Sequence, residues 1–156
     1  MADVQYFLRL GDIEGSSTDK EHPKEIELLS WAWGAANVGR PHSGGGGGAG
    51  KLDVDELTFV AVGGVASPKI FLACAQGRHL PEAVLTGRRK AGKGVKQNFL
   101  VIRLKEVLVA SFATVAGEDD LPEDEVAIVF DTIEIEMSEG GATVKAGWDI
   151  GAAHPI

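Results

Sequence analysis

The sequence is short of the features that mark several specialised classes of protein. It has one cysteine, Cys74, which excludes an intrachain disulfide and a zinc site built on a cysteine cluster. No stretch approaches the roughly 18 consecutive apolar residues of a membrane-spanning helix. The first residues, MADVQYFLRLGD, lack the basic and apolar regions of a signal peptide. We therefore expect a chain without membrane insertion that folds in a reducing cytoplasm and, if it is exported, leaves without a signal peptide.

Positive charge is also scarce. The chain has 15 lysines and arginines against 23 acidic residues, a net charge of −8. A nucleic acid or an anionic membrane needs a basic surface, so neither is an expected partner. The length of 156 residues, with 44% hydrophobic and 24% charged residues, is typical of one globular domain over residues 1–156.

Catalytic and cofactor motifs are absent or incomplete. Gly87–Lys93 fits the G-x-x-x-x-G-K pattern of a phosphate-binding loop, but Gly94 follows where magnesium binding needs Ser or Thr, and the next residues, VKQNFLVIRL, predict a strand. No H-E-x-x-H or G-x-S-x-G is present, and the four histidines show no paired spacing: His22, His42, His79 and His154. The sequence predicts no enzyme, no cofactor and no metal site.

The most informative stretch is Lys24–Gly34, KEIELLSWAWG, whose alternation predicts a β-strand. One face of this strand carries Leu29, Trp31 and Trp33 beyond Glu27. Two tryptophans expose more apolar area than soluble monomers usually leave in water. Two interpretations stay open: a strand buried on both sides within one domain, or a strand that contacts a second copy.

Glycine is concentrated rather than scarce. Of 21 glycines, five form the run Gly44–Gly48, inside the segment Ala35–Lys51. Ordering a glycine costs more backbone entropy than ordering any other residue. We therefore expect a protruding loop at residues 35–51, either a tolerated insertion or an arm that becomes ordered on a partner.

The rest of the chain predicts mainly strands. Ser67 and Pro68 begin the one convincing helix, which Gly77 ends, with Ile70, Phe71 and Cys74 on one face. About eight strands are expected, with ranges 5–10, 24–34, 51–61, 82–88, 97–104, 107–115, 125–137 and 143–150. Eight strands and one helix with short connections predict a β-barrel or sandwich with the helix covering one opening or edge.

Opposite charges are segregated in two of the predicted turns. One turn holds the basic residues Arg88, Arg89, Lys90, Lys93 and Lys96, and the other holds the acidic residues Glu118, Asp119, Asp120, Glu123, Asp124 and Glu125. Such segregation favours head-to-tail contact between copies, which builds rings or filaments. Two merely solvated turns are the alternative.

Four blocks of sequence together resemble the Hcp (haemolysin-coregulated protein) family, which forms the inner tube of the bacterial type VI secretion system. The blocks occur in the family's order from about Tyr6 to Ile150: GSSTDKEH with EIELLSWAWG, SPKIFLACAQGRHLPEAVLTGRRKAG, DEVAIVFDTIEIEM and VKAGWDI. The polyglycine run Gly44–Gly48 is a departure, at the place of the family's protruding loop.

The resemblance implies a β-barrel of two sheets with one flanking helix, which assembles as a hexameric ring. Rings would stack head-to-tail into a non-enzymatic tube that carries small effectors. The tube would be capped by a spike protein, wrapped by a contractile sheath, assembled in the bacterial cytoplasm and then secreted. Residues 35–51, with Arg40, Pro41 and His42, would be the arm between rings. Leu29, Trp31, Trp33 and the two charged turns would contribute to subunit contacts.

Two other functions fit the same sequence. The first is a monomeric β-barrel that binds a small apolar ligand. The second is a tube subunit of a phage tail, which would assemble in a similar way within a virion.

Overall fold

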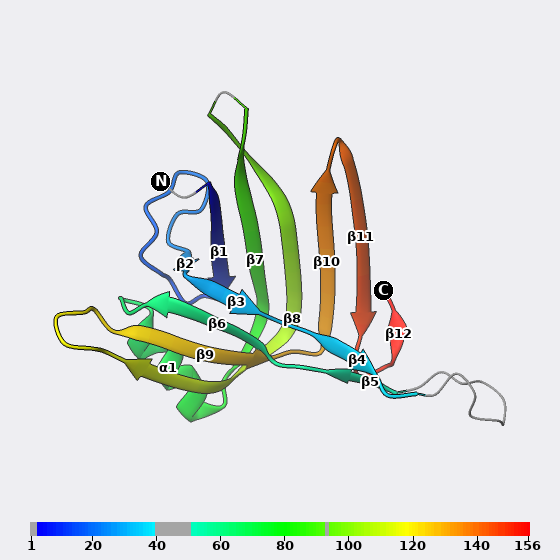
Figure 1. Cartoon of the computed structure of the whole chain (residues 1–156). Helices are drawn as coiled ribbons and strands as arrows, with labels where there is room; N and C mark the ends of the chain where they lie inside the picture. Colours follow the sequence, from blue (N-terminus) through cyan, green and yellow to red (C-terminus); the bar gives the residue numbers. More distant parts are fainter. Residues whose placement is uncertain (1–2, 40–50, 93) are drawn as a thin grey trace.

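The computed structural model describes residues 3–39, 51–92 and 94–156, which form one helix and twelve strands. Arg40, Pro41 and His42 lie outside the described residues. In chain order (Figure 1) the elements are β1 Val4–Leu10, β2 Ile26–Leu28, β3 Ser30–Ala32, β4 Ala35–Asn37, β5 Leu52–Val54, β6 Leu57–Val62, α1 Ser67–Gln76, β7 His79–Ala91, β8 Val95–Val115, β9 Glu123–Val129, β10 Thr132–Glu139, β11 Ala142–Asp149 and β12 His154–Pro155.

The 21-residue strand β8 belongs to both layers of the protein. Its first part pairs with β7 and β10 in an upright layer, and its second part pairs with β9 in a layer that crosses below (Figure 1). Between the two parts, Glu106 adopts a φ of 53°, a left-handed conformation in which the strand can turn. We expected separate strands at 97–104 and 107–115, so the prediction of a break was wrong.

The strand ladder is open rather than closed into a barrel. The upright layer has the order β12-β11-β10-β8-β7-β1-β2, and the crossing layer continues from β8 through β9 and β6 to β3. Within the described residues, β2 pairs on one side only, with β1. After β2 the chain turns at Leu29, and the next strand, β3, pairs with β6 instead. The predicted mainly β fold with one flanking helix is confirmed, and the predicted barrel closure is wrong.

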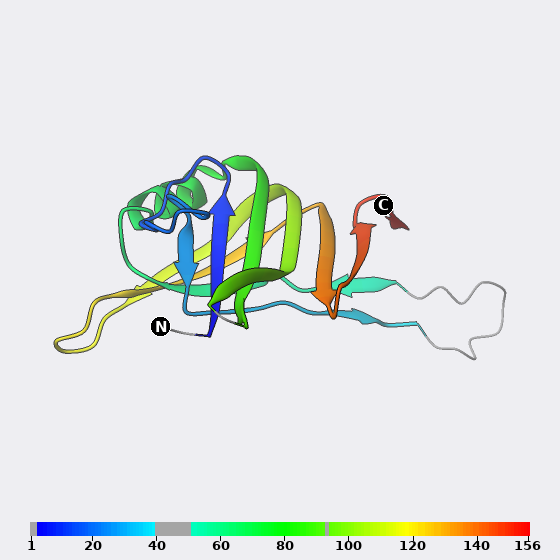
Figure 2. The same ribbon diagram turned by 90° about the horizontal axis from the view of Figure 1, so that it is seen from above.

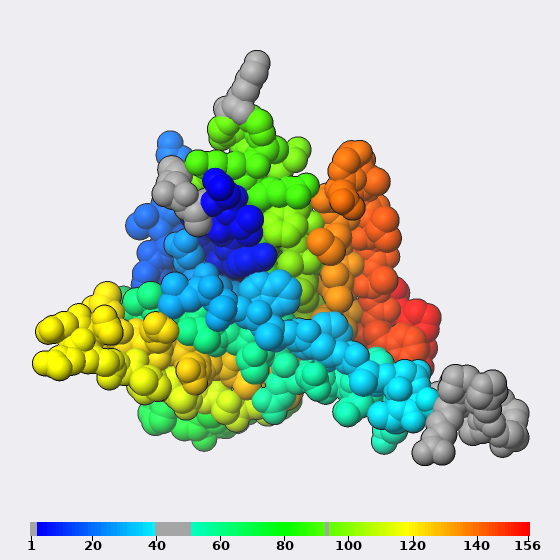
Figure 3. All heavy atoms as spheres, in the orientation of Figure 1, coloured from blue at the N-terminus to red at the C-terminus, as the bar shows by residue number. Residues whose placement is uncertain are grey.

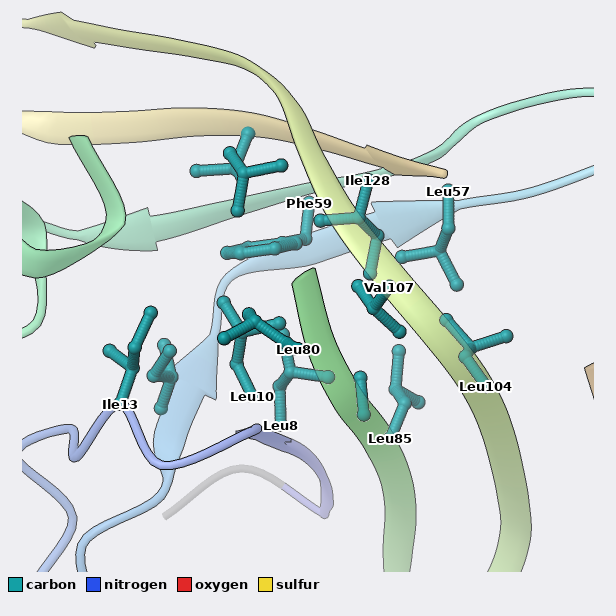
Figure 4. Close-up of a cluster of buried hydrophobic side chains, with 14 of the residues drawn as sticks. Leu8, Leu10, Ile13, Leu57, Phe59, Leu80, Leu85, Leu104, Val107 and Ile128 are labelled. Carbon is teal, nitrogen blue, oxygen red and sulfur yellow. The ribbon is translucent and has the colours of Figure 1, made fainter. Parts of the chain in front are cut away.

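A single hydrophobic core fills the angle between the layers. Figure 4 shows Leu8, Leu10, Leu85 and Leu104 of the upright layer facing Leu57, Phe59 and Ile128 of the crossing layer. The cross-strand row Ala83–Leu104–Ile133 lines the upright side, and the row Phe112–Val126–Phe59–Trp31 lines the crossing side. Burial of these rows removes a large apolar area from water, which is the main favourable term in folding.

Helix α1 covers the crossing layer at the expected place, with two differences. Gly77 ends the helix in the left-handed conformation, at φ 59°, as predicted. Ser67 is not the N-cap: Ala66 occupies that position, and the Ser67 hydroxyl donates instead to Asp124. Ile70 is buried, but Phe71 is exposed and touches the ring of Phe112 from outside, at 6.2 Å between centroids.

Three of the expected strands are each two strands. The expected strand 24–34 is β2 and β3, 51–61 is β5 and β6, and 125–137 is β9 and β10. At each break the chain changes its partner strands, and between β5 and β6 it also passes from the two-stranded sheet to the ten-stranded one. Apolar residues occur on both sides of these corners, so alternation alone gave no sign of them.

The segment predicted as a loop at 35–51 begins and ends in a ribbon. Its first residues form β4, which pairs with β5 as a separate two-stranded sheet, with Asn37 opposite Leu52. Figure 2 shows this ribbon extending from one end of the molecule, while the hairpin between β8 and β9 extends from the other end. Residues 40–50 lie outside the described part of the chain.

A pair of variants, one at a buried and one at an exposed apolar residue, tests the core. Leu85 is fully buried, whereas Val144 of β11 is 72% exposed. We expect Leu85→Ala to lower the free energy of unfolding by about 2–5 kcal/mol, because it leaves a cavity, and Val144→Ala to change it by less than about 0.5 kcal/mol. Urea unfolding at fixed protein concentration measures both; equal effects would contradict the described core.

Candidate assembly surfaces

The two tryptophans of the central stretch pack mainly on their own protomer. Trp31 meets the ring of Tyr6 edge-on, with centroids 5.7 Å apart. The Trp33 indole N–H donates to the carbonyl of Asp55 at 3.0 Å, and both indoles are half-buried against the core.

Leu29 is the corner residue and differs from the tryptophans. It is 56% exposed, and its backbone N–H donates to the carbonyl of Val60 at 2.8 Å. Since the corner shifts the alternation by one residue, Leu28 and Trp31 point inward while Leu29 and Ser30 point outward. Of the three residues in this stretch that were predicted for a subunit contact, Leu29, Trp31 and Trp33, only Leu29 is exposed.

Arg88 does not belong to the surface group of cations. Its side chain is 2% exposed, and both of its terminal nitrogens donate to Asp19, Nη1 to Oδ1 at 2.9 Å and Nη2 to Oδ2 at 2.6 Å. Nη2 also donates to the Gln5 amide oxygen at 2.8 Å. Both terminal nitrogens therefore have partners within the protomer, whereas Nε is buried without one. A contact of Arg88 with another copy stays a prediction.

An aromatic stack completes this buried group, which we call the Arg88 clamp: Arg88, Asp19, Phe7 and His22. The Arg88 guanidinium lies 4.9 Å from the centre of the Phe7 ring. The His22 imidazole stacks on the same ring at 4.5 Å, with 9° between the planes, and its Nδ1 is 3.1 Å from a Glu25 carboxylate oxygen.

The clamp attaches the polar loop before β2 to strands β1 and β7. Sequence reasoning gave no role in this contact to Asp19 or His22. Asp19 and Arg88 are 69 residues apart, and no local pattern connects them. Phe7 gave the one possible signal, because it lies on the face of β1 opposite Leu8 and Leu10 and still needs an apolar cover.

The clamp also fixes a charge. The hydrogen bonds from the Arg88 guanidinium hold the pKa of the Asp19 carboxyl far below its ordinary value of 3.8. The same hydrogen bonds raise the pKa of Arg88 above its ordinary value. Both side chains therefore remain ionised throughout the physiological pH range.

The remaining charged residues form two separate exposed groups. Arg89 and Lys90 are exposed near the end of β7, and the Arg89 guanidinium lies 5.4 Å from the centre of the Phe99 ring. Asp119 and Asp120 are exposed in the turn between β8 and β9, whereas Asp124 is buried and leaves the predicted acidic group. The two groups project in different directions (Figure 1).

The described residues hold no group of three or more His, Cys, Asp and Glu side chains placed to bind a metal ion. Across the same residues, every helix is too short or too polar to span a membrane. The space between the layers is filled by the side chains of Figure 4, unlike the open calyx of a ligand-binding barrel.

The class defined by these observations is a two-layered, mainly β protein with one helix and with charged hairpins that project from a hydrophobic core. Comparison with known proteins identifies the family. Residues 7–137 match the family model described as Type VI secretion system effector, Hcp. Protein hcp1 of Pseudomonas aeruginosa is 41% identical over 94% of this chain and 95% of its own.

Solved structures agree with this assignment. Hcp1 from Salmonella typhimurium has a TM-score of 0.85 and 30% identity, covering 99% of this chain and all of its own. A structure described as a type six secretion system protein has a TM-score of 0.85 and 26% identity, covering 97% of this chain and 99% of its own. The chain belongs to the Hcp family of type VI secretion, a family of secreted tube proteins and not a known family of enzymes.

The Asp19–Arg88 pair predicts a pH dependence of stability. The folded-state pKa of Asp19 lies below its unfolded value near 3.8. The contribution of the pair to the free energy of unfolding is therefore complete above pH 3.8 and is lost as the pH falls below that value. We expect Asp19→Asn to lower the free energy of unfolding at pH 7 by about 2 kcal/mol, less than a fully buried pair because Asp19 is partly exposed, and to flatten its decline between pH 5 and 3.

Glu21→Gln is the matched control for this prediction. Glu21 is exposed and its carboxylate is 3.8 Å from Arg88, so its removal changes stability little. Urea unfolding across the pH series measures both variants. An Asp19→Asn protein with the wild-type pH slope would contradict the role of the clamp.

Proposed function

We propose that this chain is the structural subunit of a type VI secretion inner tube. Six copies close into a ring, and rings stack head-to-tail into a tube. The tube assembles in the cytoplasm, is capped by a spike protein and wrapped by a sheath, and is ejected with small effectors in its channel. Family membership supports the secretion system; the ring, the stacking and the cargo are our proposal.

The observation that carries the proposal is the placement of the two charged hairpins. The basic end of the β7–β8 hairpin and the acidic β8–β9 hairpin leave the body in different directions, as Figure 3 shows for the yellow and green regions. They cannot pair with each other in one protomer. Complementary groups on different sides of a molecule are what a repeating, heterologous contact needs.

Exposed apolar side chains provide a second surface for contact. They lie on and around α1 and the β8–β9 hairpin, and each is more than half exposed: Val65, Phe71, Leu72, Val115 and Leu121. Soluble monomers seldom leave such groups of large apolar residues in water. We propose that they are covered by a neighbouring copy, together with Leu29.

The β4–β5 ribbon supports a role for residues 35–51 between rings. It projects beyond the body of the protein (Figure 1) and pairs Asn37 with Leu52. The described residues on either side of the segment that holds Arg40, Pro41 and His42 therefore lie side by side at the end of a projecting element. We propose that this arm reaches the next ring.

A charge-reversal series tests the head-to-tail contact. We expect Arg89→Glu with Lys90→Glu to weaken assembly, and the further change of Asp119→Lys with Asp120→Lys to restore it. Each exposed pair contributes about 0.2–1 kcal/mol, so moderate salt should also weaken wild-type assembly. Sedimentation velocity measures the assembled fraction.

Lys20→Glu with Lys24→Glu makes the same change of net charge elsewhere on the surface and is the control. The contact is refuted if the fourfold variant assembles no better than the double variant, or if assembly is indifferent to salt.

A deletion separates ring formation from stacking. Removing Gly44–Gly48 shortens the arm while leaving β4 and β5 paired. We expect rings of about six times the 16.4 kDa protomer by light scattering, as for the wild type, but shorter tubes by negative-stain electron microscopy. Unchanged tube length would rule out the arm, and a wild-type protein that remains a 16.4 kDa monomer at micromolar concentration would rule out the tube.

A further inference from the structure

A cavity of about 390 Å³ lies at the seam where the ladder stays open. Its walls come from the unpaired edge of β2 and from β6, and the loop at residues 15–18 and the start of α1 complete it. Ile26, Leu28, Phe59 and Ile70 supply apolar surface, and Ser16 supplies a hydroxyl. The volume falls in the range of small-molecule sites.

A buried carboxylate lines this cavity. Asp124 is 3% exposed, and its Oδ2 accepts a hydrogen bond from the Ser67 hydroxyl, which itself accepts from the Gly64 N–H at 3.0 Å. Asp124 Oδ1 is buried and has no hydrogen-bond partner. A carboxylate oxygen left without a donor is costly, so buried polar atoms of this kind are uncommon and need an explanation.

The charge of the lining selects the ligand. Asp124 and Glu27 both line the cavity, and none of the residues around it is Lys, Arg or His. A ligand that satisfies Oδ1 must therefore bring a donor, and a positively charged donor gains most. Oδ2 already accepts from Ser67, so Oδ1 is the one oxygen without a donor. A compact ammonium group matches this single acceptor better than the planar, two-pronged guanidinium does.

The apolar walls determine the rest of the ligand. A short alkyl chain next to the ammonium group would cover Ile26, Leu28 and Phe59, which a hydrated metal ion would not. A divalent ion also needs more oxygen ligands than this one buried carboxylate offers.

We infer that the seam cavity binds an alkylammonium group, with Asp124 Oδ1 accepting its proton donor and the apolar walls holding its chain. All the lining residues belong to one protomer. Leu29, which the proposed function covers with a neighbouring copy, is among them, so the inference concerns the free protomer, in which this face is accessible. The group can come from a free primary amine or from a lysine side chain of another protein.

Calorimetric titration of the full chain tests the inference with three probes: n-butylammonium, its neutral counterpart butan-1-ol, and N-acetyl-lysine-N-methylamide. We expect butylammonium to bind at least about tenfold more tightly than the alcohol, a difference of about 1.4 kcal/mol. Asp124→Asn should remove that preference, because it removes the charge but keeps the shape.

Two further variants make the result specific. Ser16→Phe adds bulk at the exposed rim and should weaken binding of every probe without touching Asp124, so it tests the site even if Asp124→Asn fails to fold. Ser67→Ala keeps the carboxylate and should retain the preference for the ammonium probe.

The lysine derivative distinguishes the two sources. Binding as tight as that of butylammonium indicates a lysine of another protein, and binding of the free amine alone indicates a small metabolite; both support the site. The inference is overturned if the wild type binds no ammonium probe at millimolar concentration, if amine and alcohol bind equally, or if Ser16→Phe binds like the wild type.

Discussion

The rest of the structure depends on one strand that serves two layers. β8 pairs with β7 and β10 before Glu106 and with β9 after it, so the angle between the layers is set within a continuous backbone. The backbone of this one strand thereby connects the two faces of the core. The filled interior follows, because Leu104 and Phe112 of the same strand belong to the two opposing apolar rows. The surfaces proposed for assembly lie in the hairpins that project from this core.

The projections and the seam carry the functional argument. Hairpins extend beyond the core because β7, with 13 residues, and β8, with 21, run past the strands beside them, and charge is left exposed at the hairpin ends. Where charge instead falls near the body, the fold buries it with a partner, as in the Arg88–Asp19 pair. Asp124 is intermediate: one oxygen has a partner in Ser67 and the other has none. Exposed charges therefore mark the proposed assembly surfaces, a paired charge marks the Arg88 clamp, and the half-paired Asp124 marks the seam cavity.

Much of the secondary structure could be predicted from the sequence, because it depends on local signals. Alternation predicted the first strand, the β7–β8 hairpin and the last long strand, and Pro68 with Gly77 predicted α1. The breaks between β2 and β3, between β5 and β6 and between β9 and β10 were missed, because a chain that changes its partner strands can remain apolar on alternate residues. Leu29 shows the consequence. It is the corner residue, so the alternation shifts by one and the residues after it that face the core are those expected on the other face. Trp31 and Trp33, which were predicted to contact a neighbouring copy, pack on Tyr6 and Phe130 of the same chain.

The sequence by itself determined the class of the protein: mainly β with one helix, and acidic. The order of its four motif blocks also pointed to the family. These properties reside in composition and short-range pattern, which the chain carries before it folds. The tertiary structure alone decided which charges remain available. Arg88 and Arg89 are neighbours in sequence, yet one is buried against Asp19 and the other is exposed, because adjacent residues of a strand point to opposite faces and only the folded chain determines what covers each face.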